Sequence, residues 1–155
     1  MNDCRRWFAL CLPLGVVLGL SLGACGSRVT PYEQLSASGG VLAATFDAAH
    51  ERLVDDYPSY LGPSELRLRR GGRRHVEVPV EVGWCYAFFA VAEDTLLDLD
   101  LWATRPNGRE ASRDEMLDAT PLLLYCSDWS EPLTVTIDAA RGRGRVAFGV
   151  LRKPD

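Results

Sequence analysis

Apolar side chains alternate with polar ones between residues 75 and 82. The apolar positions are Val76, Val78, Val80 and Val82, and the intervening ones are His75, Glu77, Pro79 and Glu81. Successive side chains of a β-strand point to opposite faces, so this pattern predicts a strand with one face toward a core and one toward water. Pro79 has no N–H group to donate to a neighbouring strand, which favours an edge position for this strand.

Six further segments have the length and composition of short strands. They are 65–69, 84–92, 96–104, 121–126, 133–138 and 145–152. Turn-forming residues separate them, for example Gly71-Gly72 and Pro106-Asn107-Gly108. A chain of 155 residues has room for one core, so we predict a mostly β protein, an antiparallel jelly-roll-like β-sandwich over residues 64–153. Residues 109–120 show no clear pattern.

One helix is expected ahead of the sandwich. Its apolar stripe consists of Leu42, Phe46, Ala49, Leu53 and Tyr57, which recur at intervals of three and four. This spacing predicts an amphipathic helix over residues 40–58. Residues 25–39 are rich in Ser, Gly and Thr and are expected to form a flexible tether with a reach of about 20 Å.

The N-terminal residues have the pattern of a secretion signal. Charged residues in 1–6 precede an apolar stretch from Trp7 to Gly23, so residues 1–24 are expected to be a cleaved signal peptide. A transmembrane helix over the same residues is the alternative, although Pro13 and the glycines make this stretch a poor helix.

The motif Leu22-Gly23-Ala24-Cys25 at the end of this segment resembles the lipobox of bacterial lipoproteins. The resemblance implies that Cys25 is acylated and becomes the N-terminus of a protein held in the bilayer of the cell envelope. Gly26 stands where many inner-membrane lipoproteins have aspartate, which favours the outer membrane, facing the periplasm. The alternative is an ordinary cysteine after a chance Leu-Gly-Ala.

The chain has five cysteines. Cys4 and Cys11 would leave with the signal, and Cys25 would carry lipid. Cys85 and Cys126 then remain as a pair in an oxidising compartment, so we expect a disulfide between them, with two unpaired thiols as the alternative. Such a disulfide closes a loop of about 40 residues, which stabilises a fold by about 3–4 kcal/mol in the chain-entropy model.

The chain from Val76 onward also resembles the pre-peptidase C-terminal domain family. The likeness lies in 85–88, the Asp98–Leu101 strand with its Asn107-Gly108 turn, Pro121–Cys126 and Gly142–Gly144. These domains are small jelly-roll-like sandwiches, attached to secreted bacterial enzymes or standing alone in envelope proteins. The resemblance implies a role in substrate adhesion or in assisting a neighbouring enzyme.

Asp98, Asp100 and Trp102 would share one side of the strand 96–104. With Asn107, Asp114 or Asp118 from the following loop, the two aspartates could supply oxygen ligands for a structural calcium ion. The alternative is a solvated face on which nearby arginines pair with the aspartates. Trp102 would be either exposed in a binding patch or buried beneath the helix. Burial is favoured, because an amphipathic helix must bury its apolar stripe against another element.

Five arginines crowd one predicted hairpin and form a candidate site for an anionic surface such as phospholipid or polysaccharide. They are Arg67, Arg69, Arg70, Arg73 and Arg74. The alternative is a solvated run balanced by acids of the helix, such as Asp47 and Glu51.

Catalytic patterns are weak in this sequence. The histidines are His50 and His75, which lack the spacing of zinc ligands, and no serine lies in a nucleophile-elbow motif. The formal net charge of −4 does not suggest a nucleic-acid partner. We therefore expect no catalytic residues and no required cofactor, and a membrane-anchored, non-enzymatic module that binds a partner protein or an envelope polymer. The alternatives are a calcium-stabilised accessory domain, a lipid-anchored metal-dependent enzyme, or an inhibitor of an envelope enzyme.

Overall fold

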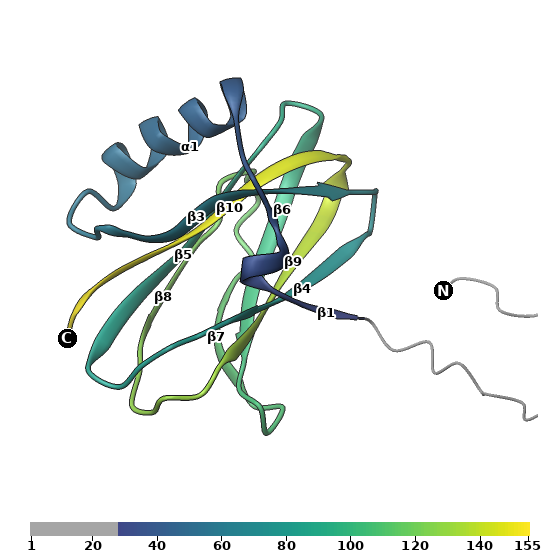
Figure 1. Ribbon diagram of the computed structural model, residues 1–155. Coiled ribbons are helices and arrows are strands. Elements are labelled where there is room, and N and C mark those ends of the chain that lie inside the picture. The colour runs from purple at the N-terminus through teal and green to yellow at the C-terminus, as the bar shows by residue number, and fades with distance from the viewer. Residues whose placement is uncertain (1–27) are drawn as a thin grey trace, which may run out of the picture.

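The computed structural model describes residues 28–155 as two stacked β-sheets with one helix laid across the outside (Figure 1). The helices are η1 (Tyr32–Gln34, a 3-10 turn) and α1 (Gly40–Leu53). The strands are β1 (Val29–Pro31), β2 (Ser36–Ala37), β3 (Ser59–Leu68), β4 (Arg73–Val78), β5 (Trp84–Ala92), β6 (Leu96–Thr104), β7 (Glu110–Asp114), β8 (Leu122–Cys126), β9 (Leu133–Gly142) and β10 (Gly144–Pro154).

The predicted antiparallel β-sandwich with one preceding helix is confirmed. One sheet, here called sheet A, has the strand order β1-β4-β9-β6-β7, and the other, sheet B, has the order β2-β3-β10-β5-β8. Within the described residues, every pair of neighbouring strands is antiparallel except β1 with β4. All six further predicted segments contribute to strands, and β7 fills part of the region that had no clear pattern.

The core lies between the two sheets. Sheet A contributes Leu99, Leu101 and Ile137, and sheet B contributes Phe88 and Phe148, all of them fully buried. These residues occupy alternate positions in their strands, as the period-2 pattern requires. Their polar neighbours in sheet A therefore point to the outside of the sandwich.

The central strands of sheet B, β5 and β10, are buried on both faces because α1 covers their outer side. Leu42, Phe46 and Ala49 of the helix pack on Phe89 of β5 and on β10, and the rings of Phe46 and Phe89 lie 5.0 Å apart. This double burial explains the continuous apolar run in β5, which does not alternate. Helix and sheet approach closely at Gly149, where an added Cβ would lie 2.5 Å from the Phe46 ring.

Residues 29–37 of the segment predicted as a flexible tether are part of the fold instead. β1 pairs with β4, and β2 pairs with β3. Tyr32 between them is buried, and its hydroxyl donates a hydrogen bond to the carbonyl of Phe148 at 3.0 Å. Burial raises the pKa of Tyr32 to about 12. Any tether is therefore confined to residues before Val29.

Two further expectations about boundaries were wrong. β4 ends at Val78 and lies between β1 and β9, so it is not an edge strand, and Pro79 falls just beyond it. The helix ends at Leu53, which is exposed, because the chain turns there; Tyr57 is buried in the following loop rather than in the helix.

Replacing Gly149 with alanine is expected to lower the free energy of unfolding by about 1–3 kcal/mol, because the new methyl group overlaps the Phe46 ring. Chemical denaturation measures the loss. In a double-mutant cycle, Phe46→Leu should recover part of it, since a smaller side chain leaves room for the methyl group. Strictly additive effects of the two substitutions would contradict this account of the helix–sheet contact.

Candidate functional site

The outer face of sheet A is open, because α1 lies on the other sheet. β-strand register aligns its side chains in cross-strand rows. One row contains Arg73, Asp138 and Asp100, from β4, β9 and β6. The next row contains His75, Thr136, Trp102 and Arg113, from β4, β9, β6 and β7. We call these seven residues the sheet A face.

The first row is organised by an ion pair. The Nε atom of Arg73 donates a hydrogen bond of 2.7 Å to Asp138 Oδ2. The Asp138 side chain is only 10% exposed, whereas that of Arg73 is 59% exposed. A carboxylate this buried needs a cation beside it, so Arg73 is fixed in place by Asp138 while more than half of its side chain remains exposed.

Trp102 lies in the second row and is half-buried. The expectation that the helix covers it was wrong, because α1 packs on β5 and β10 of sheet B. Instead, the guanidinium groups of Arg73 and Arg113 lie 5.3 and 5.0 Å from the centre of the Trp102 ring. Both distances are within the range of cation–π attraction.

Arg113 is held by two carboxylates. Its Nε donates to Glu110 at 2.8 Å, and its Nη1 donates to Glu115. These acids raise the pKa of Arg113. On the other side of the row, the Nδ1 atom of His75 lies 2.9 Å from the Thr136 hydroxyl. The indole of Trp102 thus lies between side chains whose positions are set by their own partners.

Asp100 lies on the same side of β6 as Trp102, as predicted, and Asp98 is close enough for its charge to act on Asp100. Desolvation raises the pKa of Asp100, and the charges of Asp98 and Asp138 raise it further. Asp98 is opposite Arg141 in β9, but its Oδ1 atom is buried and has no hydrogen-bond partner within residues 28–155. The predicted pairing of these aspartates with the arginine hairpin is not formed; Arg73 pairs with Asp138, on the strand between them.

The structure does not bring the predicted calcium ligands together. Asp114 accepts hydrogen bonds from the N–H groups of Met116 and Leu122, and Asp118 and Asn107 each accept one from a residue two positions later. These side chains therefore close their own loops. Within residues 28–155, no three His, Cys, Asp or Glu ligand atoms on the sheet A face lie within 4.8 Å of one another.

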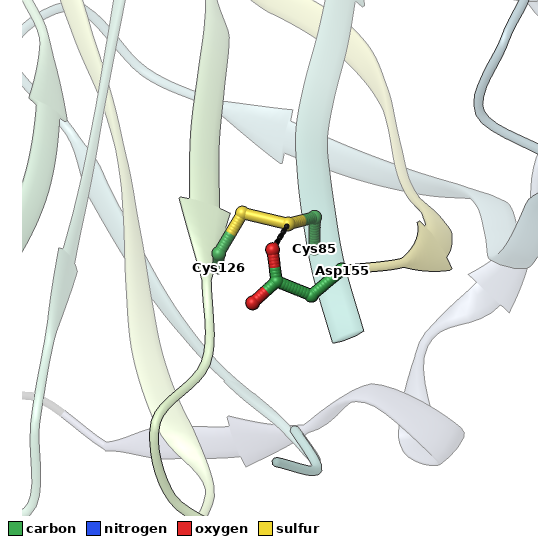
Figure 2. Close-up of side chains that lie close together, drawn as sticks. All are labelled: Cys85, Cys126 and Asp155. Carbon is green, nitrogen blue, oxygen red and sulfur yellow. Dashed lines mark hydrogen bonds between the residues drawn. A yellow bond between two sulfur atoms is a disulfide. The ribbon is translucent and has the colours of Figure 1, made fainter. Parts of the chain in front are cut away.

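The predicted disulfide is present. Cys85 and Cys126 are opposite each other in the β5–β8 pair, and their sulfur atoms are bonded (Figure 2). Asp155 lies beside the bond, with its Oδ1 atom 3.4 Å from the Cys85 sulfur. The disulfide ties the edge strand β8 to its neighbour β5, and it occupies both thiols of the described residues that could otherwise bind a metal.

The predicted arginine group is divided by the fold. Arg73 belongs to the sheet A face, whereas Arg67, Arg69, Arg70 and Arg74 are exposed around the β3–β4 connection. The acids of α1 do not balance them, since no ion pair joins Asp47 or Glu51 to an arginine among the described residues. The helix lies across the middle of sheet B instead.

The two histidines lie on different elements, one on the helix and one on sheet A. His50, on α1, has its Nε2 atom 2.8 Å from the carbonyl of Tyr57, and His75 bonds Thr136 on sheet A. Cys25 and the signal lie outside the described residues. Within those residues, no helix is both long and apolar enough to cross a bilayer.

Comparison with known proteins adds no family. No protein-family profile matches the chain, and no curated protein sequence is similar to it. The resemblances to lipoproteins and to the pre-peptidase C-terminal domain family therefore stay predictions.

Sequence reasoning missed several residues of the sheet A face. Asp138 and Thr136 end the segment Leu-Thr-Val-Thr-Ile-Asp, whose alternation places them on the outside, so this signal was available. Arg113 had no such signal, because β7 has the sequence Glu-Ala-Ser-Arg-Asp and no apolar alternation.

Asp100→Asn is expected to make the protein more stable near pH 7. The raised pKa means that the ionised carboxylate costs folding free energy, and this cost is absent below about pH 4, where Asp is protonated in both states. Melting temperatures of the two proteins should therefore coincide in acid and separate as the pH rises. An Asn variant that is less stable at pH 7 would contradict this prediction and indicate a favourable partner for the charge.

Replacing both Cys85 and Cys126 with serine is expected to lower the free energy of unfolding by about 3–4 kcal/mol. Urea denaturation of the original protein with a strong reductant provides the control, since it should lose a similar amount. If neither the reductant nor the double substitution changes stability, the bond does not contribute as described.

Proposed function

We propose that this protein is a lipid-anchored, non-enzymatic binding module of the bacterial cell envelope, and that it contacts a partner protein through the sheet A face. The observation that carries the proposal is the half-buried Trp102, with Arg73 and Arg113 held against it on a sheet surface that no helix among residues 28–155 covers. The lipobox-like motif ending at Cys25 supports the anchor and the location, with the outer membrane, facing the periplasm, favoured by Gly26.

The chemistry of the sheet A face favours a protein over a polymer. Trp and Arg are enriched among the residues that dominate binding energy in protein interfaces. Two guanidiniums near the indole leave less of its surface to stack on a sugar, while Arg73 and Asp138 offer donors and acceptors in fixed positions. Because these side chains are already positioned, a partner meets little entropic cost in ordering them.

A calcium-stabilised accessory domain is the second candidate. The observation that favours it is the buried Oδ1 atom of Asp98, which has no hydrogen-bond partner within residues 28–155, because a divalent cation would satisfy this oxygen and relieve the repulsion between Asp98 and Asp100. Melting curves with calcium and with a chelator separate the two candidates. An increase in melting temperature with calcium, absent in Asp100→Asn, supports the accessory domain; identical curves remove it.

The anchor is tested by Cys25→Ser. Without the acylated cysteine, the protein should be found in the soluble fraction of a bacterium that produces it, since no helix among residues 28–155 is long and apolar enough to cross a bilayer. Fractionation and immunoblotting measure the change, with a conservative Ser27→Ala variant as the control. A Cys25→Ser protein that stays in the membrane fraction after cleavage of its signal would contradict the proposed lipid anchor.

The sheet A face is tested by photo-crosslinking in intact cells. A photoreactive residue at Glu77, exposed on the outer side of β4, should give a defined crosslinked product, and one at Ala48, exposed on α1, should not. Adding Trp102→Ala should reduce the yield at position 77 by about tenfold. Equal crosslinking yields at positions 77 and 48 would contradict the proposal. So would an unchanged yield at position 77 in a Trp102→Ala variant whose melting curve is also unchanged. A single dominant partner that is an envelope enzyme would indicate an inhibitor.

A further inference from the structure

Arginines gather at one end of the sandwich. The β3–β4 and β9–β10 connections lie side by side there, because Ala139 exchanges main-chain hydrogen bonds with Gly71 and Gly72, and Gly144 is opposite Leu68. Figure 1 shows both connections on the same side of the molecule. The exposed arginines that these connections bring together, here called the arginine end, are Arg67, Arg69, Arg70, Arg74, Arg141 and Arg143.

The charge of the arginine end is not neutralised by the fold. Neighbouring Arg145 is paired with Glu93 and Glu65, and Arg73 is paired with Asp138. Among residues 28–155, none of the six arginines of the arginine end has a carboxylate within 4.0 Å. Six guanidiniums on a chain with a net charge of −4 form a local excess of positive charge on an otherwise acidic protein.

The surface between these arginines is hollowed. Three adjoining hollows, of about 240, 330 and 430 Å³, all have Arg67 in their walls. The largest is also lined by Arg69 and Arg143. Guanidinium groups bind phosphate through paired hydrogen bonds. Hollows lined by several arginines therefore suit phosphate-bearing ligands better than neutral ones.

The N-terminal chain leaves the fold at this same end. β1 is parallel to β4, and Val29 is opposite His75, two residues after β4 begins at Arg73. The residue before Val29, Arg28, is exposed and adds another positive charge. Cys25 precedes Arg28 by three positions, and three residues of fully extended chain span at most about 10 Å. An acylated Cys25 would thus hold the arginine end within about one Debye length of the lipid headgroups.

We infer that the arginine end rests on the anionic phospholipid headgroups of the membrane in which Cys25 is anchored. The inference rests on the proposed lipid anchor and adds an orientation to it. With the arginine end on the bilayer, the strands stand upright, the sheet A face points sideways along the membrane, and the turn at Pro106–Gly108 points away from it. A partner that binds the sheet A face would accordingly be one that lies close to the same membrane.

The test uses the lipidated protein in vesicles of phosphatidylcholine, with or without about 30 mol% phosphatidylglycerol. A nitroxide label is attached to Ala140→Cys, next to Arg141 at the arginine end, or to Glu131→Cys, before β9 at the opposite end. Collision with a water-soluble nickel chelate reports how open each label is to solvent. At position 140, we expect accessibility to fall about threefold on the anionic vesicles and to recover in about 1 M salt. At position 131, we expect no change.

Charge variants separate the arginine end from net charge. Arg69→Gln with Arg70→Gln should abolish the protection at position 140, whereas Arg52→Gln with Arg109→Gln, which removes the same charge elsewhere, should not. Protein that fails to float with neutral vesicles overturns the lipid anchor. Protein that floats with both kinds of vesicle, but whose label at 140 is equally accessible in both or responds equally to the two charge variants, overturns the contact of the arginine end alone.

Discussion

The packing of α1 on β5 and β10 determines how the rest of the molecule meets its surroundings. Phe46 fits against Gly149 and Phe89, so the central strands of sheet B have apolar side chains on both faces. One helix is long enough to cover one sheet only. Sheet A must therefore keep a polar outer face, and its threonines, aspartates and arginines follow from that requirement. The candidate binding face exists because the helix lies on the other side.

Much of the architecture could be predicted from the sequence, because most strands have either clear alternation or a continuous apolar run. The strands that were missed are short and lie at sheet edges. β7 buries little and so carries polar residues, while β1 and β2 contain only three and two residues. Their Ser, Thr and Pro content is typical of a linker, and only pairing with β4 and β3 distinguishes them from one.

The site was predictable to the level of one strand and no further. Alternation placed Asp98, Asp100 and Trp102 on the same side of β6, and the regular part of the register, from Asp100 to Thr104, puts Asp100 and Trp102 on one face. Their neighbours depend on strand order, which a single sequence does not reveal. β9 lies between β6 and β4, so Arg73 meets Asp138 before it can reach Asp100. For the same reason, the sequence could not show which sheet the helix covers, and the expected burial of Trp102 beneath it was wrong.

The parallel pairing of β1 with β4 has a mechanical consequence. A force on the chain before Val29 pulls along the axis of β1, so it loads the hydrogen bonds of this strand in shear and all at once, rather than peeling them apart in succession. Behind β1, the buried Tyr32 adds a second point of attachment at Phe148, in the other sheet. Tension that enters at the N-terminus is therefore shared between both halves of the sandwich.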